Sequence, residues 1–257
     1  MKLFLQSMGQ GGTPLACLHG FMGSGDNLWP LADHLKNSHR CLLMDLRGHG
    51  RSPHGQPYTL EGMADDVYET LQDAGIGPTA VLGHSLGGKV ALALALRHPD
   101  MVERLIIADV TMAKVPPVFT VLLDDMARVP VHTLTRREEA EPYLQSAEPL
   151  LATRRFLLKN LVAAPGGGYQ WRLDLKGLRE DHERFLDAVP KGAPFKGQAL
   201  LIHGQKSDIV TPEGIALTRS FFPKLRVLDL PGGHWIHVDA KDQFNAAVGE
   251  FLNKEKI

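Results

Sequence analysis

The chain has 257 residues, with 28 Lys or Arg and 29 Asp or Glu, which gives a formal net charge of −1 at pH 7. This balance argues against nucleic acid or an anionic membrane as the partner, because both are bound by strongly basic surfaces. The length is typical of one large α/β domain, which buries enough apolar surface to need no disulfide bonds.

Short apolar runs alternate with segments of helical periodicity along most of the chain. The runs predicted to be strands are residues 2–7, 14–18, 40–46, 79–82, 104–110, 199–203 and 226–230. The segments predicted to be helices are residues 27–35, 60–71, 86–97 and 244–252. Cys17 and Cys41 fall in two of the strands and are expected to be buried, reduced thiols. The alternation predicts the α/β class, with a mostly parallel central sheet and helices on both faces.

The alternation stops between residues 112 and 194, a segment with charge runs such as residues 136–139. We expect a mostly helical insertion in one core domain, which residues 1–111 and 195–257 form together. An insertion at the carboxyl edge of a parallel sheet lies over the place where such sheets bind ligands. The functional interpretation is a lid that shapes a substrate pocket and excludes water. The alternative is an appendage that serves packing alone.

The strongest chemical signal is the Gly-His-Ser-Leu-Gly-Gly segment at residues 83–88, which matches G-x-S-x-G between a predicted strand and a predicted helix. In that context the serine sits on a sharp turn that exposes its hydroxyl, and the glycines avoid clashes between Cβ atoms and backbone. We therefore predict Ser85 as a nucleophile and the backbone N–H of Leu86 as a donor to an oxyanion. The alternative is a glycine-rich turn with a passive serine.

A loop at residues 19–23 follows the second predicted strand and supports this interpretation. The backbone N–H of Phe21 is our candidate for the second oxyanion donor. The side chain of His19 is expected to orient the loop and to take no part in the chemistry.

A second loop, residues 232–235, follows the last predicted strand and carries His234 between glycines and a tryptophan. A histidine on this loop can take the proton of the serine and later return it, so that we predict His234 as the general base. The nearest rival is His237, which lies where the last helix is about to begin.

The motifs together resemble those of a known family. Four segments resemble α/β-hydrolase signatures in their usual order, residues 19–23, 45–52, 83–88 and 232–235. Three segments resemble a smaller branch of bacterial carboxylesterases and related mitochondrial abhydrolase-domain proteins, residues 157–161, 171–172 and 233–237. The resemblance spans nearly the whole chain and implies the α/β-hydrolase fold with a Ser-His-Asp triad. Because members of the branch cleave short or medium acyl esters and thioesters, it also implies a carboxylesterase or thioesterase.

The acid of such a triad has two candidates, because chain order places it between the serine and the histidine. Asp208 follows the strand predicted at residues 199–203, where the family usually keeps its acid, but it stands one residue later than the usual Gly-x-x-Asp spacing. Asp109 ends the preceding predicted strand. The branch often has serine at the position of Ser207 and aspartate at that of Asp109. The resemblance thus favours Asp109 and leaves Asp208 as the alternative.

Two rival functions compete with a serine hydrolase. Residues 83–89 are one residue short of a phosphate-binding P-loop, but Val90 stands where a hydroxyl must bind the metal. The other rival is a ligand-binding protein without catalytic activity on the same scaffold. An intact set of serine, acid and histidine argues against it.

We therefore expect a serine hydrolase that cleaves acyl esters or thioesters through an acyl-enzyme, with no cofactor and no metal. Trp29, Phe119, Met126 and Trp171 are candidates for an apolar acyl pocket, with plain core packing as the alternative. We expect no signal peptide, and no apolar run in the sequence reaches the roughly 18–20 residues that a membrane span requires. We expect a soluble, cytoplasmic protein whose partner is a small acyl substrate, and we make no prediction of its oligomeric state.

Overall fold

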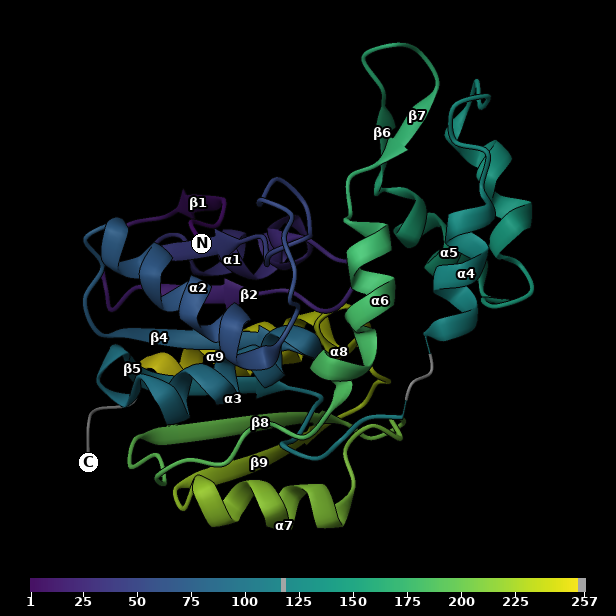
Figure 1. The fold of residues 1–257 in the computed structure, drawn as a ribbon. Helices are drawn as coiled ribbons and strands as arrows, with labels where there is room; N and C mark the ends of the chain where they lie inside the picture. The colour runs from purple at the N-terminus through teal and green to yellow at the C-terminus, as the bar shows by residue number, and fades with distance from the viewer. Residues whose placement is uncertain (117–118, 254–257) are drawn as a thin grey trace.

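The computed structural model describes residues 1–116 and 119–253, and its centre is a seven-stranded sheet in the order β1-β3-β2-β4-β5-β8-β9 (Figure 1). These strands are β1 (Leu5–Met8), β2 (Leu15–Leu18), β3 (Cys41–Met44), β4 (Thr79–His84), β5 (Val102–Ala108), β8 (Gln198–Gly204) and β9 (Leu225–Leu230). β1 runs antiparallel to β3, whereas every other neighbouring pair is parallel. The mostly parallel sheet predicted from the apolar runs is confirmed.

Helices cover both faces of this sheet, as predicted. Successive side chains of a strand point to opposite faces, and in β2 Leu18 packs into the core of one face while Cys17 packs into that of the other. The first face carries α2 (Leu60–Asp73), α3 (Leu86–Arg97) and α7 (Pro212–Phe221), and the second carries α1 (Trp29–Leu35) and α9 (Lys241–Asn253). Figure 1 shows α2 and α3 in front of the sheet and α9 behind it. Cys17 and Cys41 are both buried and free, as expected.

Some boundaries differ from the sequence-based expectations. β5 ends at Ala108, so that Asp109 lies in the turn after the strand and not at its last position. Helix α7 was not predicted, although its start carries ordinary helix signals: the Thr211 side chain caps it, and Pro212 is its first residue.

The chain between β5 and β8, where a mostly helical insertion was expected, contains four helices within its described residues and long connecting segments. Its helices are α4 (Thr120–Arg128), η3 (Arg137–Leu144), α5 (Leu151–Leu158) and α6 (Leu175–Leu186). β6 (Leu161–Ala163) and β7 (Tyr169–Trp171) add an antiparallel hairpin that was not predicted. In Figure 1 the insertion stands at the right of the sheet. Of the helices in the described part of the chain, none is long and apolar enough to cross a membrane.

The two ends of the insertion are joined to each other and to helix α3. The N–H of Val115 donates to the carbonyl of Leu186 over 2.8 Å. The ammonium of Lys89, on α3, donates to the carbonyls of Ala113 and Asp187, each at 2.7 Å. A buried lysine thus holds both ends of the insertion against the helix that follows Ser85.

Candidate active site

Ser85 occupies a strained turn between β4 and α3. Its φ of 51° is in the left-handed region, which residues other than glycine rarely adopt. The neighbouring glycines make the turn possible: a Cβ on Gly83 would lie 2.1 Å from the carbonyl oxygen of Gly87, and one on Gly87 would lie 2.3 Å from that of Leu18. Only glycine fits at these two positions, so the sequence builds a turn that lifts the serine hydroxyl clear of the backbone.

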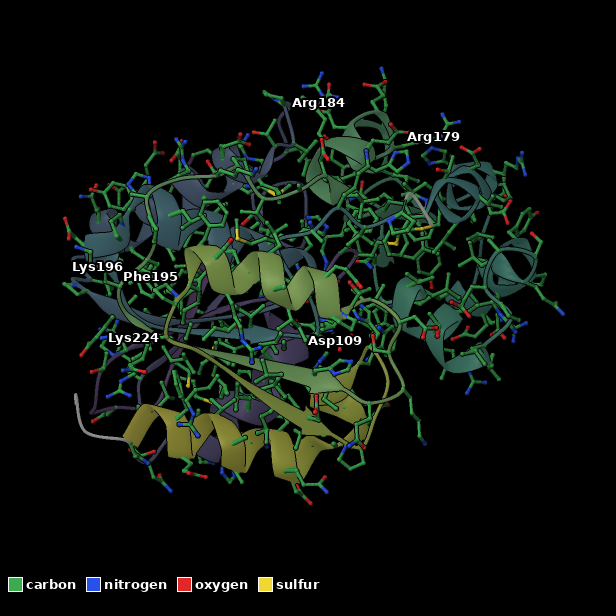
Figure 2. All side chains as sticks on the ribbon, turned by 90° about the horizontal axis from the view of Figure 1, so that it is seen from below. Asp109, Arg179, Arg184, Phe195, Lys196 and Lys224 are labelled. Atoms are coloured by element: carbon green, nitrogen blue, oxygen red, sulfur yellow. The ribbon has the colours of Figure 1, made fainter. Side chains whose placement is uncertain are left out.

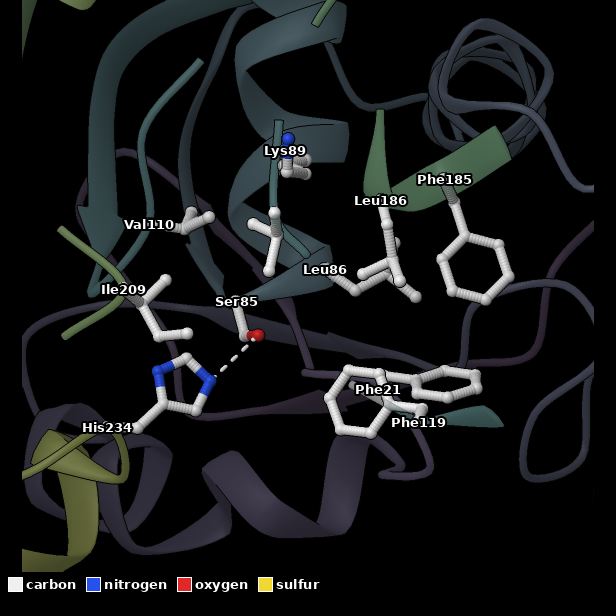
Figure 3. A pocket seen from close by; sticks show the side chains of 11 residues that line it. Phe21, Ser85, Leu86, Lys89, Val110, Phe119, Phe185, Leu186, Ile209 and His234 are labelled. Carbon is white, nitrogen blue, oxygen red and sulfur yellow. Dashed lines mark hydrogen bonds between the residues drawn. The ribbon is translucent and has the colours of Figure 1, made fainter. Parts of the chain in front are cut away.

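His234 lies within hydrogen-bonding distance of Ser85 on one side and of a carboxylate on the other. Its Nε2 is 2.9 Å from Ser85 Oγ, a contact drawn in Figure 3, and its Nδ1 is 2.7 Å from Asp109 Oδ2. The loop that carries His234 runs from the end of β9 to α8 (Ile236–Asp239). An imidazole in this position can take a proton from the hydroxyl while the carboxylate stabilises the resulting cation.

Asp109 is fully buried, and each hydrogen bond to it fixes its orientation. Its Oδ1 accepts the N–H of Gly204 over 2.9 Å, and its Oδ2 also accepts the hydroxyl of Ser207. Asp208, the alternative acid, is exposed. In Figure 2 Asp109 lies near the insertion, at the opposite end of the strands from Lys196 and Lys224. Because its hydroxyl donates to Oδ2, Ser207 serves as a hydrogen-bonding partner of the Asp109 carboxylate.

The two candidate oxyanion donors belong to segments that adjoin Ser85. Leu86 is the first residue of α3, where backbone N–H groups have no acceptor within the helix. Phe21 lies in the loop after β2, which packs directly against the turn: a Cβ on Gly20 would be 3.4 Å from Ser85 Cβ. Asn160 of the insertion donates from Nδ2 to the carbonyl of Met22 over 2.8 Å, and Met22 has a φ of 58°. The sequence marked the segment that contains Asn160 but did not predict this contact, since Met22 lies far away in the chain.

Buried histidines surround the site and support its loops. His19 Nε2 accepts the N–H of Leu46 over 3.0 Å, so its Nδ1 carries the proton and donates to Gly20 O at 2.7 Å. His19 thus orients the loop, as expected. His84 Nε2 lies 2.8 Å from the carbonyl of His234 and supports the histidine loop.

The rival histidine, His237, is in a different environment from His234. Burial, followed by the nearby His234, lowers the pKa of His237 to about 4. Its ring packs 4.5 Å from that of His84, measured between centroids. Burial likewise lowers the pKa of His84 well below its usual value. Both side chains therefore stay neutral near pH 7. His84 has a hydrogen-bonding partner in the carbonyl of His234, whereas His237 contributes through packing, and its buried Nδ1 has no hydrogen-bond partner among the described residues.

Ser85 and His234 border two connected spaces. The first is an apolar pocket of about 220 Å³ (Figure 3). Its other lining residues are Phe21, Leu86, Lys89, Val110, Val115, Phe119, Phe185, Leu186 and Ile209. The second is a wider cleft of about 680 Å³ with more polar walls, which Phe156 and Trp235 also line. The serine hydroxyl therefore has an apolar cavity on one side and an open cleft on the other.

Of the four large side chains proposed for an acyl pocket, only Phe119 lines the apolar pocket. Trp29 is 41% exposed at the start of α1, so its assignment to the pocket is wrong. Met126 is fully buried in the core, and the indole N–H of Trp171 donates to its carbonyl over 3.2 Å. Size and apolarity indicated burial correctly for Met126 but could not indicate which cavity a side chain faces.

Within residues 1–116 and 119–253, no three His, Cys, Asp or Glu side chains are grouped closely enough to hold a metal ion.

The chain is similar to known proteins in both sequence and structure. A family model described as "alpha/beta hydrolase fold" matches residues 13–241. The sn-1-specific diacylglycerol lipase ABHD11 of Mus musculus is 34% identical over 91% of this chain and 79% of its own. Esterase YbfF of Escherichia coli K12 is 27% identical over 94% of this chain and 93% of its own. A solved structure titled "Marine microorganism esterase" superimposes with a TM-score of 0.93 at 32% identity and covers 97% of this chain and 99% of its own.

Proposed function

The chain belongs to the alpha/beta hydrolase fold family and is a carboxylic ester hydrolase, and we propose that it cleaves short- to medium-chain acyl esters or thioesters through Ser85. The observation that carries the proposal is the unbroken line of contacts from Ser85 Oγ to His234 and on to Asp109, at 2.9 and 2.7 Å. Such a line is the arrangement by which a weak hydroxyl becomes a nucleophile.

The first step forms an acyl-enzyme. His234 takes the proton of Ser85 as the oxygen attacks the carbonyl carbon of the substrate. The backbone N–H groups of Phe21 and Leu86 stabilise the negative charge on the carbonyl oxygen. The protonated His234 then gives its proton to the leaving alcohol or thiol, while Asp109 stabilises the imidazolium.

The second step releases the acid. Water attacks the acyl-enzyme, His234 accepts its proton, and Ser85 regains its hydrogen when the tetrahedral intermediate collapses. Asp109 holds the imidazole in the tautomer that presents an unprotonated Nε2 to the serine, because its Oδ2 accepts from Nδ1. The three side chains therefore act as one unit, and loss of any one of them removes most of the acceleration.

The two spaces at Ser85 suggest which part of the substrate lies where. The apolar pocket suits an acyl chain, because Phe119, Phe185 and Ile209 offer it no polar partner. The wider, more polar cleft suits the leaving group. We assign the insertion, residues 112–194, the role of a lid, since Phe119 and Phe185 belong to it and wall the pocket.

A graded series of p-nitrophenyl esters and acyl-thioesters from two to twelve carbons tests the proposal. We expect hydrolysis that peaks at short or medium chains. In Ser85→Ala we expect a fall in kcat of about 10⁴-fold or more, because removal of a triad member leaves only weak residual catalysis. A folded wild-type protein that cleaves no member of the series would overturn the function.

A further inference from the structure

A smaller, polar pocket of about 180 Å³ adjoins the wide cleft at Ser85. Both spaces are lined by Phe156 and Lys159 and by parts of the loop at residues 22–27. The polar pocket also contains Arg172. A substrate that reaches from the serine through the wide cleft therefore meets this pocket without crossing the protein interior.

The hairpin of the insertion brings two cations to this pocket. Leu161 of β6 pairs with Trp171 of β7, and the N–H of Arg172 donates to the carbonyl of Asn160 over 2.8 Å. Lys159, the residue before Asn160, is thereby held on the same side of the molecule as Arg172.

Neither cation is neutralised by the protein. Within the described part of the chain, the side chains of Lys159 and Arg172 make no hydrogen bond and no ion pair, and Nε of Arg172 is buried without an acceptor. A guanidinium and an ammonium that have no anionic partner in this part of the protein are available to an anionic ligand.

The acidic side chains near the pocket already have partners of their own. Asp26 lines the pocket, but its Oδ1 lies 3.1 Å from the guanidinium of Arg51. Glu148 lines the adjoining cleft, and its Oε1 accepts the N–H of Leu150 over 2.9 Å. The cleft also holds Arg155, which adds a third positive charge. The balance of charge around the pocket is therefore positive.

We infer that this pocket is a subsite for a phosphate group carried by the alcohol or thiol that leaves when the acyl-enzyme forms. A guanidinium binds two phosphate oxygens at once, and a lysine ammonium adds a compact point charge. The inference rests on the proposed function, because it places the phosphate on the leaving-group side of Ser85. The same chemistry is offered by a phosphorylated pantetheine thiol and by a phosphorylated glycerol.

Two matched pairs of substrates test this subsite, and each pair differs by one phosphate. The first pair is the butyryl thioesters of pantetheine and 4′-phosphopantetheine, and the second is the butyryl esters of glycerol and glycerol 3-phosphate. At low ionic strength, where charge pairs are screened least, we expect kcat/KM to be about tenfold higher for the phosphorylated member of one pair. The pair that shows the preference identifies the source of the phosphate.

The double variant Lys159→Gln with Arg172→Gln is expected to reduce that ratio to within about twofold, because it removes both charges that face the phosphate. For Lys159→Gln alone, we expect a ratio of kcat/KM between that of wild type and that of the double variant. Lys114→Gln is the matched control, since Lys114 is an exposed lysine whose ammonium lies 3.8 Å from Asp187 and outside this pocket. It should keep the wild-type ratio.

Calorimetric titration with 4′-phosphopantetheine and with glycerol 3-phosphate examines binding without turnover. We expect one of them to bind to wild type and to Lys114→Gln, and neither to bind to the double variant. Equal kcat/KM within both pairs, or a preference that the double variant keeps, would overturn the subsite while ester cleavage itself stands. A wild type that binds the phosphate compound but cleaves no ester would overturn the proposed function instead.

Discussion

Nδ1 of His234 lies 2.7 Å from Oδ2 of Asp109, which places the carboxylate partner of the histidine in the turn after β5 and not in the loop after β8. The position that usually carries the acid in that loop holds Ser207, whose hydroxyl donates to the same carboxylate. β5 and β8 are neighbours in the sheet, so either loop is close enough to supply an acid. The contact between His234 and Asp109 is the observation that favours Asp109.

Substitution of each aspartate by asparagine tests the choice of acid. We expect Asp109→Asn to lower kcat by about 10⁴-fold, because an amide favours the wrong imidazole tautomer and leaves the imidazolium unstabilised. Asp208→Asn is the matched control and should change kcat by less than about twofold, since its side chain is exposed on the surface. Ester hydrolysis by the two purified variants measures this, and near-full activity of Asp109→Asn would show that the assignment is wrong.

Lys89 should be important for stability through its contacts with the insertion. Lys89→Met keeps most of the side-chain volume but leaves the carbonyls of Ala113 and Asp187 without a donor. We expect the free energy of unfolding to fall by about 1–3 kcal/mol, because both carbonyls are only partly buried and water replaces part of the lost bonding. Urea denaturation measures the change. Lys114→Met, which removes only an exposed lysine, should stay within about 0.5 kcal/mol of wild type, and an equally small change in Lys89→Met would contradict the account.

Asn160 should affect catalysis through the loop that carries Phe21. Asn160→Leu removes the donor to the carbonyl of Met22, a residue held at a φ of 58°. A loop released from that conformation no longer fixes the proposed oxyanion donor, so we expect kcat to fall by about 10- to 100-fold, somewhat less than loss of a donor itself. Steady-state kinetics should show a smaller change in KM. A variant with unchanged kcat and a normal melting temperature would mean that the loop holds its shape without the asparagine.

Stability should fall in mild acid because buried histidines must stay neutral in the folded protein. Burial lowers the pKa of His237 to about 4 and that of His49 to about 3, whereas a histidine in the unfolded chain titrates near 6.5. The unfolded chain therefore binds more protons, so the stabilisation is complete above about pH 6.5 and is lost progressively toward pH 4. Each group contributes at most about 1.4 kcal/mol per pH unit in this range. Urea denaturation from pH 7.5 to 4.5 should show a shallower slope in His237→Phe than in wild type, and identical slopes would contradict the assignment.

The sequence predicted those parts of the protein that depend on local patterns. The apolar runs predicted the strands, and the glycines at positions 83 and 87 predicted the turn at Ser85, since both signals arise from residues close together in the chain. The acid could not be chosen by chain order, because Asp109 and Asp208 follow adjacent strands.

Contacts between distant segments account for most of what was missed. The bond from Asn160 to Met22 joins residues 138 positions apart, and no short motif encodes it. The pocket assignment of Trp29 was wrong because apolar character does not reveal which surface a side chain faces. The hairpin of β6 and β7 is only three residues long on each side, too short for a clear alternating pattern.

Covalent labelling by a fluorophosphonate probe, followed by mass spectrometry of the digested protein, tests most directly whether Ser85 is an activated nucleophile. We expect one adduct on the peptide that contains Ser85 in wild type, much slower labelling in His234→Ala, and no adduct at that peptide in Ser85→Ala. A folded wild-type protein that stays unlabelled, or that is labelled at another residue, would contradict this expectation. The unlabelled result would favour a ligand-binding protein built on this scaffold.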